Sequence, residues 1–160
     1  MSGPALCCPP GSWGAAAPPE GYVNKGKHEQ LGPNLNGYVV RPSSGNKSGR
    51  AIIACPDIYG ESSGRTKAIC DDFAEKLDCL VVLPGFLEND AWQESWGITG
   101  NVFYTAYNLI WFIPWCVRHN NNKTRALYES DLKGFLAKEE IKAFGVFSFC
   151  WGALPGVALS

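Results

Sequence analysis

The sequence predicts an α/β protein built around a parallel sheet. Three continuous apolar runs support this prediction, at residues 51–55, 80–83 and 143–148. Each is bounded by turn-forming residues, which is typical of strands buried on both faces. The segments between them carry helical periodicity, and strands that alternate with helices favour parallel βαβ units with right-handed crossovers.

The remaining elements follow from local signals. Residues 1–34 are rich in Pro and Gly and are expected to form an irregular arm, followed by one domain over 35–160. The first strand of that domain is predicted at 38–41, where Pro42 ends it.

Three helices are predicted between the later strands. The first covers 65–78, where Ile69, Phe73 and Leu77 recur on one face. The second covers 102–113 and ends near Pro114, and the third covers 124–138.

Composition and charge exclude several classes of protein. The chain has 14 Lys and Arg against 15 Asp and Glu, so its charge balance gives no reason to expect nucleic acid or an anionic membrane as partner. Seven cysteines without a CxxC pair, and only two histidines, predict neither a zinc site nor another metal or cofactor. The first 20 residues lack the features of a signal peptide, and the apolar stretch 109–117 is too short for a membrane span. We therefore expect a cytoplasmic protein with free thiols.

The segment Ser148-Phe149-Cys150-Trp151-Gly152 has the form small-x-nucleophile-x-Gly directly after a predicted strand. A sharp strand-to-helix turn forces its central residue into strained backbone geometry and requires small neighbours two residues away. Such a turn lifts the Cys150 thiol above the sheet edge at the start of a helix, where the local positive field favours a thiolate. A buried structural cysteine after a core strand is the alternative interpretation.

Three segments in order resemble the dienelactone hydrolase family of α/β-hydrolases. AIIACPDIYG at residues 51–60 resembles a strand of that family that ends in an acidic residue, Ile, an aromatic and Gly. Val82-Leu83-Pro84 followed by Gly85-Phe86 resembles the next strand, and the Cys150 segment resembles the family's G-x-C-x-G-G, with Ser148 and Ala153 in place of two glycines.

The resemblance implies a three-layer α/β-hydrolase-type sheet and hydrolysis of a small-molecule ester or lactone, with Cys150 as the nucleophile. The backbone N–H groups of Ile58 and Trp151 would form the oxyanion hole. Asp57 stands where the family has a glutamate that contacts the thiol, and a turn-forming aspartate after Pro56 is an equal alternative.

The sequence after Cys150 contains no histidine to complete a catalytic triad. In α/β-hydrolases the acid and the histidine follow the nucleophile in the chain. His28 and His119 both precede Cys150, and both are interpreted as surface residues. We therefore expect the N-terminal part of a hydrolase domain, without its later strands and helices, or a weakly active member.

Two other functions remain open. Class I glutamine amidotransferase-like proteins also carry a cysteine elbow, on a flavodoxin-like sheet. A non-catalytic α/β module for binding or regulation is the second alternative. Arg65, Arg118 and Arg125 are candidates to pair with a substrate carboxylate, and the sequence does not choose among them or indicate an oligomeric state.

Overall fold

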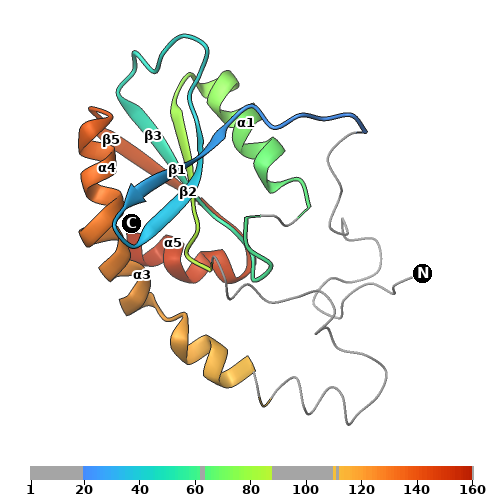
Figure 1. Ribbon diagram of the computed structural model, residues 1–160, viewed down its shortest axis with the longest axis vertical. Coiled ribbons are helices and arrows are strands. Elements are labelled where there is room, and N and C mark those ends of the chain that lie inside the picture. Colours follow the sequence, from blue (N-terminus) through green and yellow to red (C-terminus); the bar gives the residue numbers. More distant parts are fainter. Residues whose placement is uncertain (1–19, 62–63, 88–109, 111, 160) are drawn as a thin grey trace.

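A computed structural model of the chain describes residues 20–61, 64–87, 110 and 112–159 (Figure 1). Most of the helix expected at 102–113 lies outside these residues. The described part forms a five-stranded sheet in the order β1-β2-β4-β3-β5. The strands are β1 Lys27–Gly32, β2 Leu35–Val40, β3 Arg50–Cys55, β4 Leu80–Pro84 and β5 Ala143–Ser148. The helices are α1 Thr66–Leu77, α3 Asn121–Leu127, the π-helix η2 Tyr128–Leu132, α4 Lys133–Lys138, the 3₁₀-helix η3 Cys150–Gly152 and α5 Ala153–Leu159.

The sheet is mixed, which corrects the expectation of a parallel sheet. β4, β3 and β5 pair in parallel, whereas β1 pairs antiparallel with β2, and β2 antiparallel with β4. β1 also lies inside the segment expected to be an irregular arm. Its sequence KHEQLG carries little apolar signal, because an edge strand with mostly exposed side chains is held by backbone hydrogen bonds.

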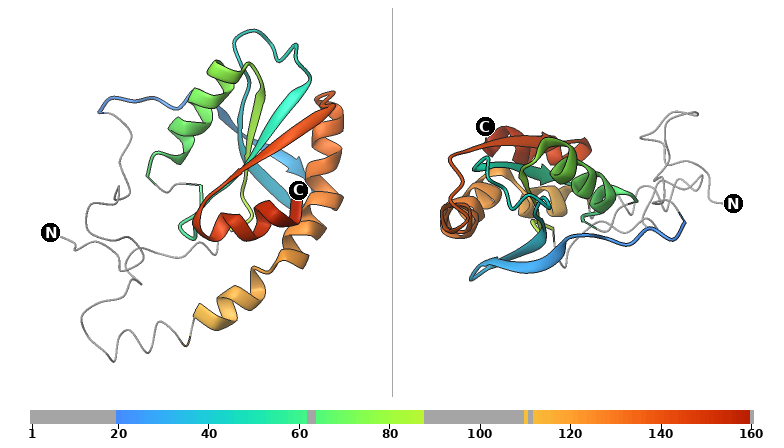
Figure 2. Two further views of the ribbon diagram at one scale, coloured as in Figure 1. Left: turned by 180° about the vertical axis from the view of Figure 1, so that it is seen from behind. Right: turned by 90° about the horizontal axis from the view of Figure 1, so that it is seen from above.

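Helices cover both faces of the sheet, so the described chain has three layers (Figures 1 and 2). α1 packs over one face, where Cys70, Ala74, Val81 and their neighbours form one apolar cluster. The helices from residue 112 to 138, together with α5, lie over the other face and form a second cluster with residues such as Ile53, Val82 and Leu132. The expected α/β layering is therefore confirmed at this coarse level.

The buried face of α1 differs from the predicted one by one residue. Cys70 and Ala74 are almost fully buried, whereas Leu77 is 49% exposed and Ile69 is half-buried. Small side chains at the contact let the helix approach the strands closely. Phe73, the remaining residue of the predicted face, packs edge-on against Phe147 of β5.

Two further helix boundaries differ from the sequence-based prediction. Residues 112–118 are helical, so Pro114 does not end that helix. The proline removes one N–H, whose partner would be the carbonyl of Ile110. The helix expected at 124–138 begins at Asn121, because the Asn120 side chain caps it by accepting from the Lys123 N–H at 3.1 Å.

A buried carboxylate anchors the start of the described chain to α1. Asp71 accepts hydrogen bonds from the Tyr22 hydroxyl at 2.5 Å, the Tyr38 hydroxyl at 2.6 Å and the Lys25 N–H at 2.9 Å. Burial, reinforced by the Asp71 carboxylate, raises the pKa of both phenols well above their ordinary value. The network therefore depends on protonated tyrosines and fixes the segment before β1 against α1.

Candidate active site

The carboxyl ends of β3 and β5 meet at a point where the chain direction changes. The chain leaves β3 through α1 on one face and leaves β5 through α5 on the other. In open α/β sheets, ligands bind in the crevice outside the carboxyl ends of the strands at such a switch point. Cys55 and Ser148, the last residues of the two strands, are paired partners, so the loops after them lie side by side.

The backbone at Cys150 is strained as the sequence predicts. Cys150 has φ 55°, and it follows the extended residue Phe149 directly at the end of β5. The other non-glycine residues with positive φ in the described chain are Asn46, Asp78 and Glu140, in a turn or after a helix end. Left-handed backbone is common at such places but costs about 1–3 kcal/mol at a cysteine between a strand and a helix. The Cys150 residue is exposed, so the interpretation as a buried structural thiol is wrong.

Glycines hold the elbow against both strands. A Cβ on Gly152 would lie 2.2 Å from the carbonyl oxygen of Cys55 and 2.5 Å from that of Pro56. A Cβ on Gly156 would lie 2.6 Å from the Ser148 Oγ. Pro155 and Gly156 both lie in α5. Glycine is needed there because the helix passes so close to β5.

The loop after β3 folds on its own hydrogen bonds. The Asp57 carboxylate accepts from the Tyr59 N–H at 2.9 Å, and the Asp57 carbonyl accepts from the Gly60 N–H at 3.0 Å. Asp57 therefore has the turn-forming role that the sequence offered as one alternative. Its contact with the Cys150 thiol, and the oxyanion-hole role of the Ile58 and Trp151 N–H groups, remain predictions.

His119 is buried, which corrects its interpretation as a surface residue. It is 4% exposed and packs against Trp115 and Trp151, with ring centroids 4.8 Å and 6.3 Å away. Trp151, the residue after Cys150, is itself 7% exposed and contacts Trp115 edge-on. The spacing of Trp115 and His119 at i and i+4 was the available signal that both lie on one buried helix face.

His28 is confirmed as a surface residue, and it lies in a separate cluster. Its side chain is 50% exposed and its Nε2 lies 3.1 Å from the Lys67 Nζ and 3.4 Å from a Glu61 carboxylate oxygen. Among the residues that the structure describes, neither histidine nor any other residue is hydrogen-bonded to the Cys150 side chain. The described chain thus brings together a candidate nucleophile and a candidate oxyanion loop, and it places no histidine within hydrogen-bond distance of the Cys150 thiol.

The four other described cysteines differ from Cys150 in burial. Burial raises the pKa of the Cys55 and Cys70 thiols to about 12, and it also raises the pKa values of Cys79 and Cys116. We expect iodoacetamide to label Cys150 first under native conditions, Cys116 more slowly, and the other three only after unfolding, because alkylation needs an exposed thiolate. Peptide mass spectrometry with and without denaturant measures this order, and early labelling of Cys55 or Cys70 would contradict it.

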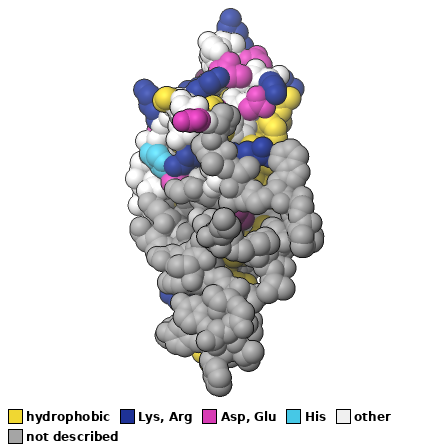
Figure 3. All heavy atoms as spheres, turned by 90° about the vertical axis from the view of Figure 1, so that its right-hand side faces the viewer, with side chains coloured by type: hydrophobic (Ala, Val, Ile, Leu, Met, Phe, Trp, Pro, Cys, Tyr) yellow, Lys and Arg dark blue, Asp and Glu magenta, His cyan; other side chains and the backbone are white. Residues whose placement is uncertain are grey.

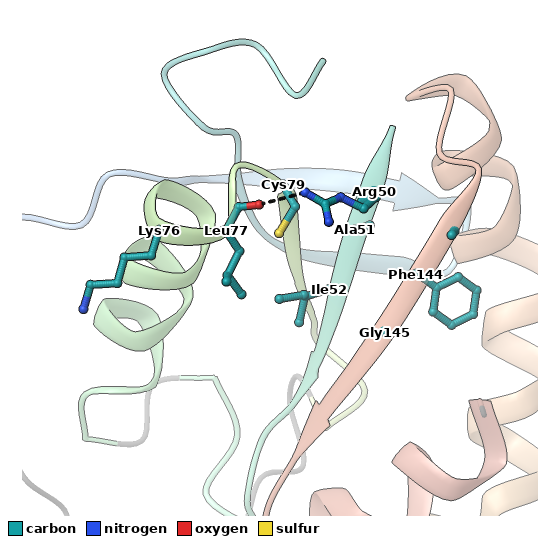
Figure 4. Close-up of a pocket in the computed structure, with 9 residues that line it drawn as sticks. Arg50, Ala51, Ile52, Lys76, Leu77, Cys79, Phe144 and Gly145 are labelled. Carbon is teal, nitrogen blue, oxygen red and sulfur yellow. Dashed lines mark hydrogen bonds between the residues drawn. The ribbon is translucent and has the colours of Figure 1, made fainter. Parts of the chain in front are cut away.

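A groove of about 540 Å³ lies at the opposite, amino ends of β3 and β5 (Figure 4). Ile52 and Leu77 point into it from β3 and α1, and Arg50 donates to the Leu77 carbonyl across its end. None of the candidate site residues lines it. The groove is the part of the α1 face that α1 does not cover, beside the edge strand β5.

The fold and the site define an α/β protein with an exposed cysteine in a strained strand-to-helix elbow. No protein-family model matches the chain, and no curated protein or solved structure matches it either. No group of three or more described His, Cys, Asp or Glu residues is arranged to hold a metal ion. No helix among the described residues is both long and apolar enough to cross a membrane.

Proposed function

We propose that the chain is a cysteine-nucleophile hydrolase of the dienelactone hydrolase type that acts on small-molecule esters or lactones. The carrying observation is the positive φ of an exposed Cys150 at the switch point of the sheet. Strained backbone at a reactive residue is the feature that distinguishes a nucleophile elbow from an ordinary strand end. The loop that carries Ile58 lies directly beside this elbow, since Gly152 packs on the carbonyls of Cys55 and Pro56.

The proposed chemistry begins at the Cys150 sulfur. The thiolate attacks the carbonyl carbon, a C–S bond forms, and the ester C–O bond breaks as the alkoxide leaves and takes up a proton. Water then hydrolyses the thioester, which releases the acid and restores the thiol. In the first step the N–H groups of Trp151 and Ile58 would stabilise the oxyanion, a contribution typically worth ~2.7–4 kcal/mol per donor.

The second step is expected to be slow. A positioned base typically contributes ~10²–10⁴-fold to such a step. Among the described residues, neither His28 nor His119 is hydrogen-bonded to Cys150. We therefore expect an activated aryl ester to give a burst of about one phenol per chain, as the acyl-enzyme fills, followed by slow turnover. Stopped-flow absorbance measures both phases.

The control for this burst is a second thiol. Cys150→Ala is expected to abolish the burst, while Cys116→Ala, which removes a half-buried thiol on another helix, is expected to leave it intact. A burst that survives Cys150→Ala would overturn the proposal. Absence of both burst and turnover in a folded chain would favour the non-catalytic module.

The strand order bears on the amidotransferase alternative. The parallel strands of this chain, taken in chain order, run 2-1-3, as in a flavodoxin-like sheet of order 2-1-3-4-5. In that sheet, however, strand 2 is the edge, whereas here the equivalent strand β4 pairs antiparallel with β2 and leads to β1. The additional antiparallel strands favour the hydrolase proposal over a flavodoxin-like amidotransferase.

A further inference from the structure

Lys67 of α1 lies at the centre of a cluster of side chains from four parts of the fold. Its Nζ lies 3.6 Å from a Glu61 carboxylate oxygen, 3.1 Å from the His28 Nε2 and 5.5 Å from the centre of the Tyr38 ring. His28 belongs to β1 and Tyr38 to β2, while Glu61 follows the loop after β3. On the face shown in Figure 3, a histidine side chain lies at the surface beside cationic and acidic side chains. We call Glu61, Lys67 and His28 the clamp.

The Lys67–Glu61 pair is less exposed than the other ion pairs of the described chain. The Lys67 and Glu61 side chains are 19% and 23% exposed. In the pair between Asp72 and Lys76, on the same helix, the side chains are 51% and 71% exposed. The second carboxylate oxygen of Glu61 is buried and has no hydrogen-bond partner among the described residues. Because an unpaired carboxylate is costly to bury, Glu61 depends on the Lys67 charge to keep its place.

The core of the protein fixes Lys67 from its other side. The Tyr38 ring, over which the Lys67 charge lies, is almost fully buried and donates a hydrogen bond to the buried Asp71. A cation over an aromatic ring is attracted by the quadrupole of the ring. Lys67 is therefore held by a rigid part of the core, and its ion pair transmits this position to Glu61.

Glu61 lies at the end of the loop that carries Ile58. The start of this loop is fixed where Gly152 of the elbow packs on two carbonyl oxygens. The Gly60 N–H then closes a turn with the Asp57 carbonyl, and Glu61 follows directly. Ile58 lies between these two fixed points, so the position of its N–H depends on both.

We propose that Lys67 and Glu61 are positioning residues for the reaction at Cys150, because they hold the Ile58 N–H where the oxyanion develops. The inference rests on the proposed function of the chain as a cysteine hydrolase. Both residues act through the loop rather than on the substrate. An oxyanion donor stabilises the transition state because it is in place before the carbonyl is attacked, so an anchor at each end of the loop raises its effect.

A purely structural role of the clamp is the alternative, and two reactions of Cys150 distinguish the two roles. Acylation by an ester develops an oxyanion that the Ile58 N–H stabilises. Alkylation by iodoacetamide forms a C–S bond as iodide leaves, and no oxyanion develops. Loss of a positioning residue therefore slows acylation alone, whereas a general loosening of the fold changes both reactions and exposes buried thiols.

Lys67→Gln and Glu61→Gln are each expected to lower the rate constant of the ester burst about 10-fold, which is part of the ~10²–10³-fold that loss of an oxyanion donor typically costs. The rate constant for alkylation of Cys150 is expected to stay unchanged, since it depends on an exposed thiolate. Lys67→Arg keeps the positive charge beside Glu61 and is expected to retain most of the burst rate. Stopped-flow absorbance measures the burst, and peptide mass spectrometry measures alkylation.

Lys76→Gln is the matched control, because it removes an exposed cation from the same helix outside the clamp, and it is expected to change neither rate. Cys55 and Cys70 should stay protected from iodoacetamide in every variant, because both thiols are buried in the folded chain. Equal burst rates in the parent chain, Lys67→Gln and Glu61→Gln, a parallel fall in acylation and alkylation, or exposure of these thiols would overturn the positioning role and leave the proposed function standing. A parent chain without a burst would overturn both.

Discussion

Gly152→Ala is expected to destabilise the chain by about 3 kcal/mol or more. The new Cβ would lie 2.2 Å from one backbone carbonyl oxygen and 2.5 Å from the next, and both belong to the loop after β3. Backbone atoms cannot swing aside as a side chain does, so the elbow or the loop must shift, and overpacking of this kind typically costs ~1–3 kcal/mol or more. The midpoint and slope of urea unfolding measure the change.

Gly134→Ala is the matched control for this prediction. Gly134 lies in α4, and a Cβ there would meet nothing within 4 Å. Because alanine is the better helix former, this change should stabilise the chain by ~0.5–1 kcal/mol. If Gly152→Ala proved as harmless as Gly134→Ala, the contact between the elbow and the loop after β3 would be wrong. The proposal that the elbow and this loop form one site would then also be wrong.

Asp71→Ala is the second change with a large expected effect, about 3–5 kcal/mol of lost stability. It removes the acceptor for two phenol hydroxyls and one backbone N–H, and unsatisfied buried polar groups cost ~1–3 kcal/mol each. Tyr38 is 2% exposed, so water cannot easily replace the lost acceptor. Thermal or urea unfolding followed by circular dichroism measures the loss.

Asp72→Ala provides the comparison at the next position. The Asp72 side chain is 51% exposed, and among the described residues its one ion-pair partner is Lys76, one turn away. The expected change is therefore within about 0.5 kcal/mol. If Asp71→Ala and Asp72→Ala cost the same, the network would contribute no stability.

The network also predicts an alkaline limit to stability. The folded pKa values of Tyr22 and Tyr38 are raised, so above pH ~10 the phenols ionise first in the unfolded chain and the free energy of unfolding falls.

The parts of the fold that could be predicted from sequence are those where packing dictates the residue pattern. β5 lies at the predicted residues 143–148, and β3 and β4 agree within a residue, because strands buried on both faces require continuous apolar runs. β1 was missed because an edge strand needs backbone partners rather than apolar side chains. Its antiparallel pairing with β2, and that of β2 with β4, are long-range relations that no local pattern encodes.

In the candidate site, too, some features could be predicted from the sequence and others could not. The strained backbone at Cys150 could be predicted because a sharp turn imposes small residues at 148 and 152. The burial of His119 was missed because its partner Trp151 lies 32 positions along the chain, at the elbow. The sequence left two alternative roles for Asp57, because an aspartate that forms a turn and one that contacts the thiol have the same local sequence.

The most direct test of the central claim, that the elbow presents Cys150 as a nucleophile, is to locate the acyl group after brief exposure of the folded chain to an activated ester. Peptide mass spectrometry of the quenched chain is predicted to find one acyl group, on Cys150, and none on Cys116 or the three buried thiols. Acylation distributed over Cys150 and Cys116 according to exposure alone, or no acylation of Cys150 in a chain that unfolds cooperatively, would contradict the account.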